Sequence, residues 1–323
     1  MEINYLNSNL RDLKKFCYQK FVKFADKPLP SKFTDLSTPL SFFNYFFDEK
    51  LYDLIVEQTN LFSYDNVFTK KDIQKYLGIC IFTSVVHMSS VRDYWSQGLR
   101  FEPIAETMSL NNFEKIRRYL HFNDNSTMLP KDHPDNDRLH KIRPVVDHLN
   151  NKYQRIPFSR DLCVDEQQCA TKARMYLKQY MPMKPHKWGY KLFMLCDVNG
   201  FADKFEIYTS SENLPKNRLP TEPDLGVKLI DYLNEHGINS LGTVRKNRTP
   251  NSKIPSDNML KKCKRGSSFE YMATYKNTNK SSVTWKDNKN VSLLSNYCGS
   301  LPYTKVKHFD RKKNKTLKLN VQL

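Results

Sequence analysis

The sequence predicts an α+β protein in which a helical region comes first and sheets follow. From Thr38 to about Arg155 the apolar residues recur at helical spacing. From Phe158 onward they form short alternating or continuous runs that are rich in aromatic residues, which is typical of strands. The chain has 323 residues, of which 39% are hydrophobic and 13% aromatic, so it can build packed cores.

Capping residues mark the starts of the expected helices. A Ser, Thr or Asp side chain at such a position accepts a hydrogen bond from a free backbone N–H of the first turn. One start also has a proline in its first turn, and another has an acidic residue three positions later, as in a capping box. The four caps are Thr38 (before Pro39), Asp48, Thr69 (with Asp72) and Ser109. A last helix is expected from about Pro144 to Tyr153, and we expect the apolar stripes to form a core.

Three strands are expected next, around Leu162 to Val164, Trp188 to Leu195 and Phe201 to Tyr208. Asp197 to Gly200 lies between the last two and predicts a hairpin loop. A helix around Val227 to Leu233 should end at Gly237. Further strands are expected at 241–244, 269–275, 283–285, 291–294, 306–309 and 317–321.

The charge is concentrated at one end of the chain. Lys and Arg number 52 against 34 Asp and Glu, a net charge of +18. From Arg245 to Leu323 the count is 19 against 4, which gives +15 and leaves +3 for residues 1–244. Such asymmetry indicates a polyanion as partner. The alternative is a basic face that only contacts water.

Several classes are excluded by what the sequence lacks. No apolar run reaches the roughly 18 residues of a membrane-spanning helix. The N-terminus has no secretory signal pattern, so an intracellular protein is expected. The seven cysteines include no CxxC pair, which argues against a disulfide framework or a zinc knuckle. P-loop, GxSxG, HExxH and dinucleotide-binding motifs are absent.

Asp165 is the one candidate for metal chemistry. It lies in the first expected strand among apolar residues, so we expect it in the middle of a sheet. A pair of divalent ions needs at least one more carboxylate. Glu166 should point to the opposite face, and Asp197 and Asp203 are expected to cap the hairpin turn. His186 lies in a basic, aromatic and rigid loop that either seats a phosphate backbone or is a structural turn closed by prolines.

Longer motifs resemble piggyBac-type transposases. The first is Asp165-Glu166-Gln167 followed by residues 176–191. Others, in the family's order, are residues 38–47, 57–60, 120–124, 137–144, 242–248 and 285–289, so the resemblance spans about Ser37 to Asp310. It implies a helical dimerisation and DNA-binding region, an RNase H-like core with three catalytic aspartates, and a β-rich insertion. Asp165 matches the first aspartate.

The sequence departs from this family pattern at the other two aspartates. The second belongs to an Asp-Asn-aromatic-aromatic-Thr block, but here Pro223-Asp224-Leu225-Gly226 runs directly into the next helix. Asp224 is not a substitute. The third lies in a Gly-Gly-Val-Asp motif beyond the stretch that ends at Leu323. We therefore expect an internal deletion and a truncation, and we expect Leu241 to Val244 to pair with the Asp165 strand.

The expected architecture has four parts. Residues 1–36 form a partly disordered N-terminal extension, and residues 37–157 a helical dimerisation and DNA-binding region. Residues 158–248 form a truncated RNase H-like core with a mixed sheet, and residues 249–323 a basic, β-rich insertion-like module.

The expected function is a transposase-derived, domesticated or decaying protein that binds double-stranded DNA in the nucleus without cleaving it. Two alternatives stay open: a fragment or partial gene model of an active Mg²⁺-dependent transposase, and a protein-interaction module. No cofactor or resident metal is expected unless an active form exists, a homodimer is one expected assembly, and a membrane partner is not. The residues expected to bind DNA are Lys184, His186, Lys187, Arg245, Lys246, Arg248, Lys261, Lys262, Lys264, Arg265, Lys312 and Lys313.

Overall fold

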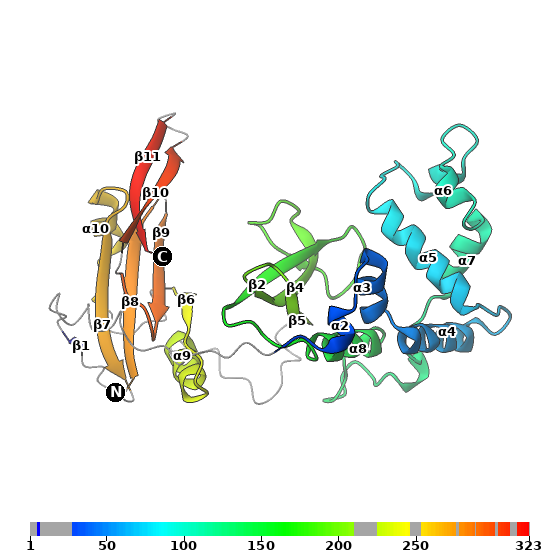
Figure 1. The fold of residues 1–323 in the computed structure, drawn as a ribbon, viewed down its shortest axis with the longest axis horizontal. Helices are drawn as coiled ribbons and strands as arrows, with labels where there is room; N and C mark the ends of the chain where they lie inside the picture. The colour runs from blue at the N-terminus through cyan, green and yellow to red at the C-terminus, as the bar shows by residue number, and fades with distance from the viewer. Residues whose placement is uncertain are drawn as a thin grey trace. The chain divides into compact units, whose positions relative to one another are not determined.

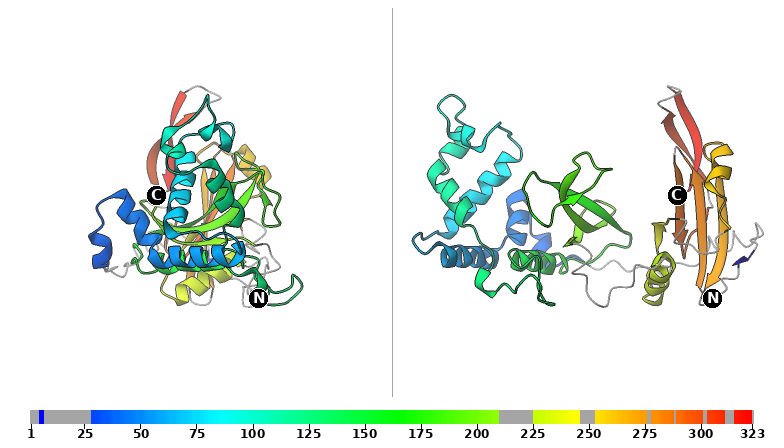
Figure 2. Two further views of the ribbon diagram at one scale, coloured as in Figure 1. Left: turned by 90° about the vertical axis from the view of Figure 1, so that its right-hand side faces the viewer. Right: turned by 180° about the vertical axis from the view of Figure 1, so that it is seen from behind.

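The computed structural model describes residues 5–6, 28–209, 225–245, 253–275, 278–287, 289–300, 303–310 and 315–322. The chain divides into two compact units (Figures 1 and 2). The first unit is Phe24–Lys216, and the second is Met1–Lys23 together with Asn217–Leu323. Within the described ranges, no helix has both the length and the apolar character that crossing a membrane requires.

The first unit begins with helices. Their bounds are α2 Ser31–Thr34, α3 Pro39–Phe46, α4 Glu49–Ser63, α5 Lys70–Thr83, α6 Glu102–Ala105, α7 Leu110–Tyr119 and α8 Arg143–Tyr153, with 3-10 turns η1 Val91–Trp95 and η2 Asn125–Thr127. All four predicted caps are confirmed: the side chains of Thr38, Asp48, Thr69 and Ser109 each accept a backbone N–H three residues later. Part of the expected N-terminal extension is helical, since α2 lies within residues 1–36.

A hydrophobic core joins α4, α5, α6 and α7. Leu51, Ile55, Ile73, Ile104 and Ile116 are each at most 1% exposed, and aromatic rings pack around them. Leu51, Ile55, Ile73 and Ile116 belong to stripes that the sequence predicts, whereas Ile104 lies in the short helix α6, which was not predicted. Burial of these apolar side chains holds the helices together.

A four-stranded antiparallel sheet completes the first unit. Its strands are β2 Leu162–Ala170, β3 Gln179–Tyr180, β4 Trp188–Asp197 and β5 Ala202–Ile207. β4 pairs with β2 on one side and with β3 and β5 on the other. The predicted hairpin is present, and Gly200 in its turn has φ of +83°. Helix α8 lies beside β5 (Figure 1), where the Asn150 side chain bonds both the N–H and the C=O of Phe205.

β2 is an edge strand, and this corrects two expectations. Asp165 lies at the edge of the sheet and is exposed, not in its middle. The strand β6 Leu241–Thr243 does not pair with β2; it pairs with β9 Asn290–Ser295 in the second unit. β6 therefore belongs to the sheet of the second unit, where it is the last strand beside β9. All pairings of the described strands are antiparallel. The mixed sheet that the sequence predicts would need a parallel pair, and the described residues contain none.

The second unit is built on a five-stranded sheet in the order β1-β7-β8-β9-β6. Besides β6 and β9 it contains β1 Tyr5–Leu6, β7 Ser268–Tyr275 and β8 Thr278–Lys286; β10 Tyr303–Asp310 and β11 Lys315–Gln322 form a separate pair, and the helices are α9 Leu225–Glu235 and α10 Asp257–Lys262. Every predicted strand of this part is present. The Asp231 carboxylate of α9 and the Lys280 ammonium of β8 form a buried ion pair at 2.5 Å.

The boundary between the units therefore differs from the expected one at residue 249. Helix α9 and strand β6 were assigned to the core around Asp165. Instead α9 is joined to the second unit by the Lys280 ion pair and by a hydrogen bond from the Asn296 to the Asn234 side chain, 3.0 Å long. The residues between the units, 210–224, lie outside the described ranges.

One glycine lets β2 and β4 approach each other. A Cβ on Gly189 would lie 2.4 Å from the carbonyl oxygen of Cys169, whereas a Cβ on Gly78 in α5 would meet nothing within 4 Å. Gly189→Ala should therefore lower the free energy of unfolding by about 2 kcal/mol through overpacking. Gly78→Ala, the control, should raise it by about 1 kcal/mol because alanine favours helix. Urea unfolding measures both; equal effects of the two changes would contradict the close approach.

Candidate nucleic-acid interface

Asp165 is placed by β2 on an open part of the sheet. It lies opposite Met194 of β4, and its Oδ1 accepts the backbone N–H of Glu166 at 2.7 Å. One carboxylate oxygen is therefore engaged with the main chain. Among the described residues no three His, Cys, Asp or Glu side chains are grouped closely enough to hold a metal ion. The residues around Asp165 do not fit a pair of divalent ions, which need several converging carboxylates.

Glu166 lies on the other face of β2, as predicted, and is not a second ligand. Its carboxylate pairs with the Lys191 ammonium of β4. The same ammonium lies over the Phe193 ring, 4.8 Å from the centroid. The Glu166 carboxylate therefore neutralises the Lys191 charge on one face of the sheet, and Asp165 lies on the opposite face.

Asp197 and Asp203 have different roles. Asp197 caps the hairpin turn as predicted: its Oδ1 accepts the N–H groups of Asn199 and Phe201, each at 2.8 Å. These bonds hold the pKa of Asp197 below its usual value. Asp203 was also expected to cap the turn, and this is wrong. Its side chain is 2% exposed, and its Oδ2 has no hydrogen-bond partner among the described residues.

Residues 171–188 are called here the basic loop; they connect β2 to β4 and include β3 and the first residue of β4. Its turn is closed by a hydrogen bond from the Met181 N–H to the Lys187 carbonyl, 2.7 Å long. Lys184 reaches back to β2, where its Nζ donates to the Glu166 carbonyl at 3.0 Å. His186 and Lys187 are exposed, and the Gln168 side chain donates to the His186 carbonyl. The loop is thus both a structural turn and a presenter of cationic side chains.

Aromatic residues accompany these cations, in agreement with the basic and aromatic character that the sequence predicts for this loop. The Tyr180 and Trp188 rings are 4.9 Å apart, and Lys178 lies over Trp188 at 5.3 Å. Both rings are 51% exposed, and Lys172 and Arg174 are exposed nearby in sequence. Aromatic and basic residues alternate through the basic loop, a pattern typical of nucleic-acid contacts.

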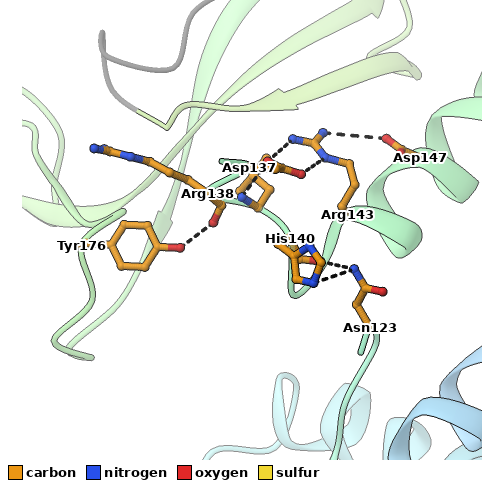
Figure 3. A network of polar contacts seen from close by, with 8 residues as sticks. Asn123, Asp137, Arg138, His140, Arg143, Asp147 and Tyr176 are labelled. Carbon is orange, nitrogen blue, oxygen red and sulfur yellow. Dashed lines mark hydrogen bonds and ion pairs between the residues drawn. The ribbon is translucent and has the colours of Figure 1, made fainter. Parts of the chain in front are cut away.

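Polar contacts fix the basic loop to the rest of the first unit (Figure 3). The Tyr176 hydroxyl donates to the Arg138 carbonyl, and Arg138 Nη1 donates to the Thr209 carbonyl at 2.9 Å. Asp137 receives two hydrogen bonds from the Arg143 guanidinium, at 2.7 and 2.8 Å. Burial alone would raise the pKa of Asp137, but the bonds from Arg143 and the Leu139 N–H lower it. The motif at residues 137–144 is therefore a structural connection.

The predicted DNA-binding residues divide between the two units. Lys184, His186 and Lys187 belong to the first unit. In the second unit Arg245, Lys261, Lys262 and Lys264 are exposed, the middle two on the last turn of α10. Arg265 is not available in the same way, because its Nε pairs with Asp287 at 2.6 Å and its side chain is 17% exposed. Lys246, Arg248, Lys312 and Lys313 lie outside the described residues.

The cysteine pattern predicts reduced and mostly buried thiols. The described cysteines are free, but the predicted burial is wrong, since two are exposed and four are half-buried. Cys80, Cys163, Cys169, Cys196, Cys263 and Cys298 are all free, and Cys17 lies outside the described residues. The pKa of the Cys196 thiol is raised, first by burial and then by negative charges that include Asp203, Asp197 and Asp165. The negative charges of the three aspartates thus disfavour the deprotonated form of this thiol.

Comparison with solved structures identifies the fold. The chain is similar to piggyBac transposase in a cryo-EM structure of its synaptic complex with hairpin DNA. The TM-score is 0.68 at 20% sequence identity, over 90% of this chain and 66% of that one.

Sequence comparison gives relatives of the same kind. The chain is 27% identical over 298 residues to human PiggyBac transposable element-derived protein 2, covering 82% of this chain and 49% of the relative. It is 25% identical over 320 residues to human PiggyBac transposable element-derived protein 3, covering 89% and 53% respectively. The chain therefore spans about half the length of the curated relatives that it matches.

The family model described as transposase IS4 matches residues 38–226 and 225–322. Its two segments meet at Leu225 and Gly226, within the stretch where the sequence departs from the family pattern. Together the segments cover most of the chain. Since the matched relatives and the structural neighbour are piggyBac proteins, the chain belongs to the piggyBac-type transposase family.

Proposed function

We propose that this protein binds double-stranded DNA through phosphate contacts and does not cleave it. The observation that carries the proposal is the basic loop, which presents Lys187 and His186 on a rigid support beside two exposed aromatic rings. The structural neighbour is a piggyBac transposase in a synaptic complex with hairpin DNA, which supports DNA as the ligand. Contacts from lysines to phosphates position a protein without reading sequence, so broad specificity is expected.

The second unit supplies further positive charge. Lys261 and Lys262 extend the last turn of α10, and Lys264 follows them in an exposed turn. The excess of +15 between Arg245 and Leu323 would attract a polyanion over several ångströms at physiological salt. The proposal also places the protein in the nucleus and includes a homodimer as its assembly.

The absence of cleavage is proposed from Asp165 and its surroundings. Asp165 stands on an exposed edge strand, and one of its carboxylate oxygens accepts a main-chain N–H. The sequence between Asp165 and α9 lacks the block that carries the family's second aspartate. The meeting of the two family-model segments at Leu225 and Gly226 supports a deletion there. One carboxylate cannot hold two divalent ions.

A second candidate function is kept because the chain spans about half the length of its curated relatives. In that case it is part of a longer, metal-dependent transposase. Sequencing the transcript across codon 226 and beyond codon 323 separates the candidates, because an in-frame segment that encodes the remaining aspartates would restore the enzyme.

DNA binding should depend steeply on salt. In fluorescence-anisotropy titrations with duplex DNA, log K should fall linearly with log salt as counterions leave the phosphates. Lys187→Gln should weaken binding of different sequences equally and reduce the slope by about 1. Lys131→Gln, at an exposed lysine outside the basic loop, is the matched control and should change neither. Weak binding with a flat salt response would contradict the proposal.

Strand cleavage should be absent whatever residue 165 is. With Mg²⁺ or Mn²⁺ and supercoiled plasmid, wild type and Asp165→Ala should nick DNA no faster than buffer with metal alone, because the metal pair lacks its ligands. Gel electrophoresis of the nicked circle measures this. Cleavage by wild type that disappears in Asp165→Ala would identify an active enzyme instead.

A further inference from the structure

Asp203 is a buried carboxylate that forms no ion pair with any residue of the described ranges. It lies on β5 with 2% of its surface exposed, and its Oδ2 accepts no hydrogen bond from any described residue. A buried charge in this condition is costly unless a partner arrives or a proton binds. The pKa of Asp203 is raised above its usual 3.8, first by burial and then by the negative charge of Asp197.

Asp203 lines a pocket within the first unit. The pocket has a volume of about 290 Å³, and its walls include Leu29, Phe33, Ile156, Phe158 and Phe201. Asp197 also lines it. Phe33 and Phe201 meet edge to face, with centroids 6.3 Å apart. Pro157 and Ser159 complete the lining. No Lys, Arg or His belongs to it, so the charged groups of this mostly apolar pocket are both negative.

This combination selects among ligand classes. A neutral apolar molecule would leave Oδ2 without a partner, at a continuing cost. A hard divalent cation needs six or more oxygen ligands, and no group of three ligating side chains is found among the described residues. An organic cation on an alkyl stem satisfies both features, because its stem packs on the rings and its head pairs with the carboxylate.

We propose that this pocket binds an alkylguanidinium group, with Asp203 as its ionic partner. A guanidinium is planar, is more weakly hydrated than an ammonium, and gives two parallel hydrogen bonds to one carboxylate. The same chemistry occurs in a free small molecule and in an arginine side chain of a partner protein. The inference is independent of DNA binding, since the basic loop contributes no residue to the pocket.

Isothermal titration calorimetry of the full chain tests the proposal. n-Butylguanidinium and the peptide acetyl-Gly-Arg-Gly-amide are the two probes. N-butylurea and the citrulline peptide are their uncharged controls. Binding of either guanidinium probe, with no binding of its urea, is expected, and which probe binds distinguishes the two sources. No binding by either probe, or equal binding of the ureas, would overturn the proposal.

Two variants place the binding at Asp203. Asp203→Asn keeps the size of the side chain and should weaken binding by about tenfold or more, because a charge-assisted pair is lost. Asp161→Asn removes a carboxylate that is exposed and already paired with Arg160, so it is the matched control and should bind as wild type. Unchanged binding by Asp203→Asn would show that another group holds the probe.

The protein without ligand gives an independent test. Because the pKa of Asp203 is raised on folding, protonation favours the folded state, and wild type loses stability as pH rises through the raised pKa. Asp203→Asn should therefore have a higher melting temperature than wild type at pH 7, and the difference should shrink as pH falls towards 3.8. Thermal unfolding followed by circular dichroism measures this. No difference at pH 7 would mean that Asp203 already has a partner.

Discussion

The pairing of β2 with β4 determines what the first unit can do. β2 has this one neighbour among the described strands, and the register fixes Asp165 opposite Met194. The approach of the two strands needs Gly189, whose missing side chain leaves room for the Cys169 carbonyl. The same pairing places the basic loop at the end of both strands. The exposure of Asp165 and the presentation of Lys187 are thus consequences of one strand contact.

Features that depend on neighbouring residues could be predicted from the sequence, and those that depend on distant partners could not. A helix cap such as Thr38 or Thr69 depends only on a hydrogen bond to the residue three positions later. The hairpin turn depends on a positive φ at Gly200, which glycine adopts readily. The partner of β6, in contrast, is β9, which lies about 50 residues later in the chain, and no local pattern around β6 identifies it. Burial of Asp203 is equally non-local, since the pocket uses residues between Leu29 and Phe201.

Positive charge and DNA-binding surface are related less simply than the composition indicates. The excess lies after residue 244, yet Arg265 is engaged with Asp287 inside the second unit. The nearly neutral part of the chain instead contains the basic loop, where the Trp188 ring lies under the Lys178 ammonium and the Glu166 carbonyl accepts a hydrogen bond from Lys184. Ordering a lysine in this way costs conformational entropy on folding, so a ligand that met such a side chain would not have to meet that cost again.

Side chains complete the four-stranded sheet at both borders. On the β5 border, the Asn150 amide bonds the N–H and C=O of Phe205, as an adjoining strand would. On the β2 border, the Asp165 carboxylate accepts a hydrogen bond from the Glu166 N–H, and the Lys184 ammonium donates one to the Glu166 carbonyl. Main-chain groups that could recruit a foreign strand are thereby occupied at these points. These side chains therefore protect the sheet against the addition of a further strand at the points that they occupy, and leave other surfaces of the unit free for association.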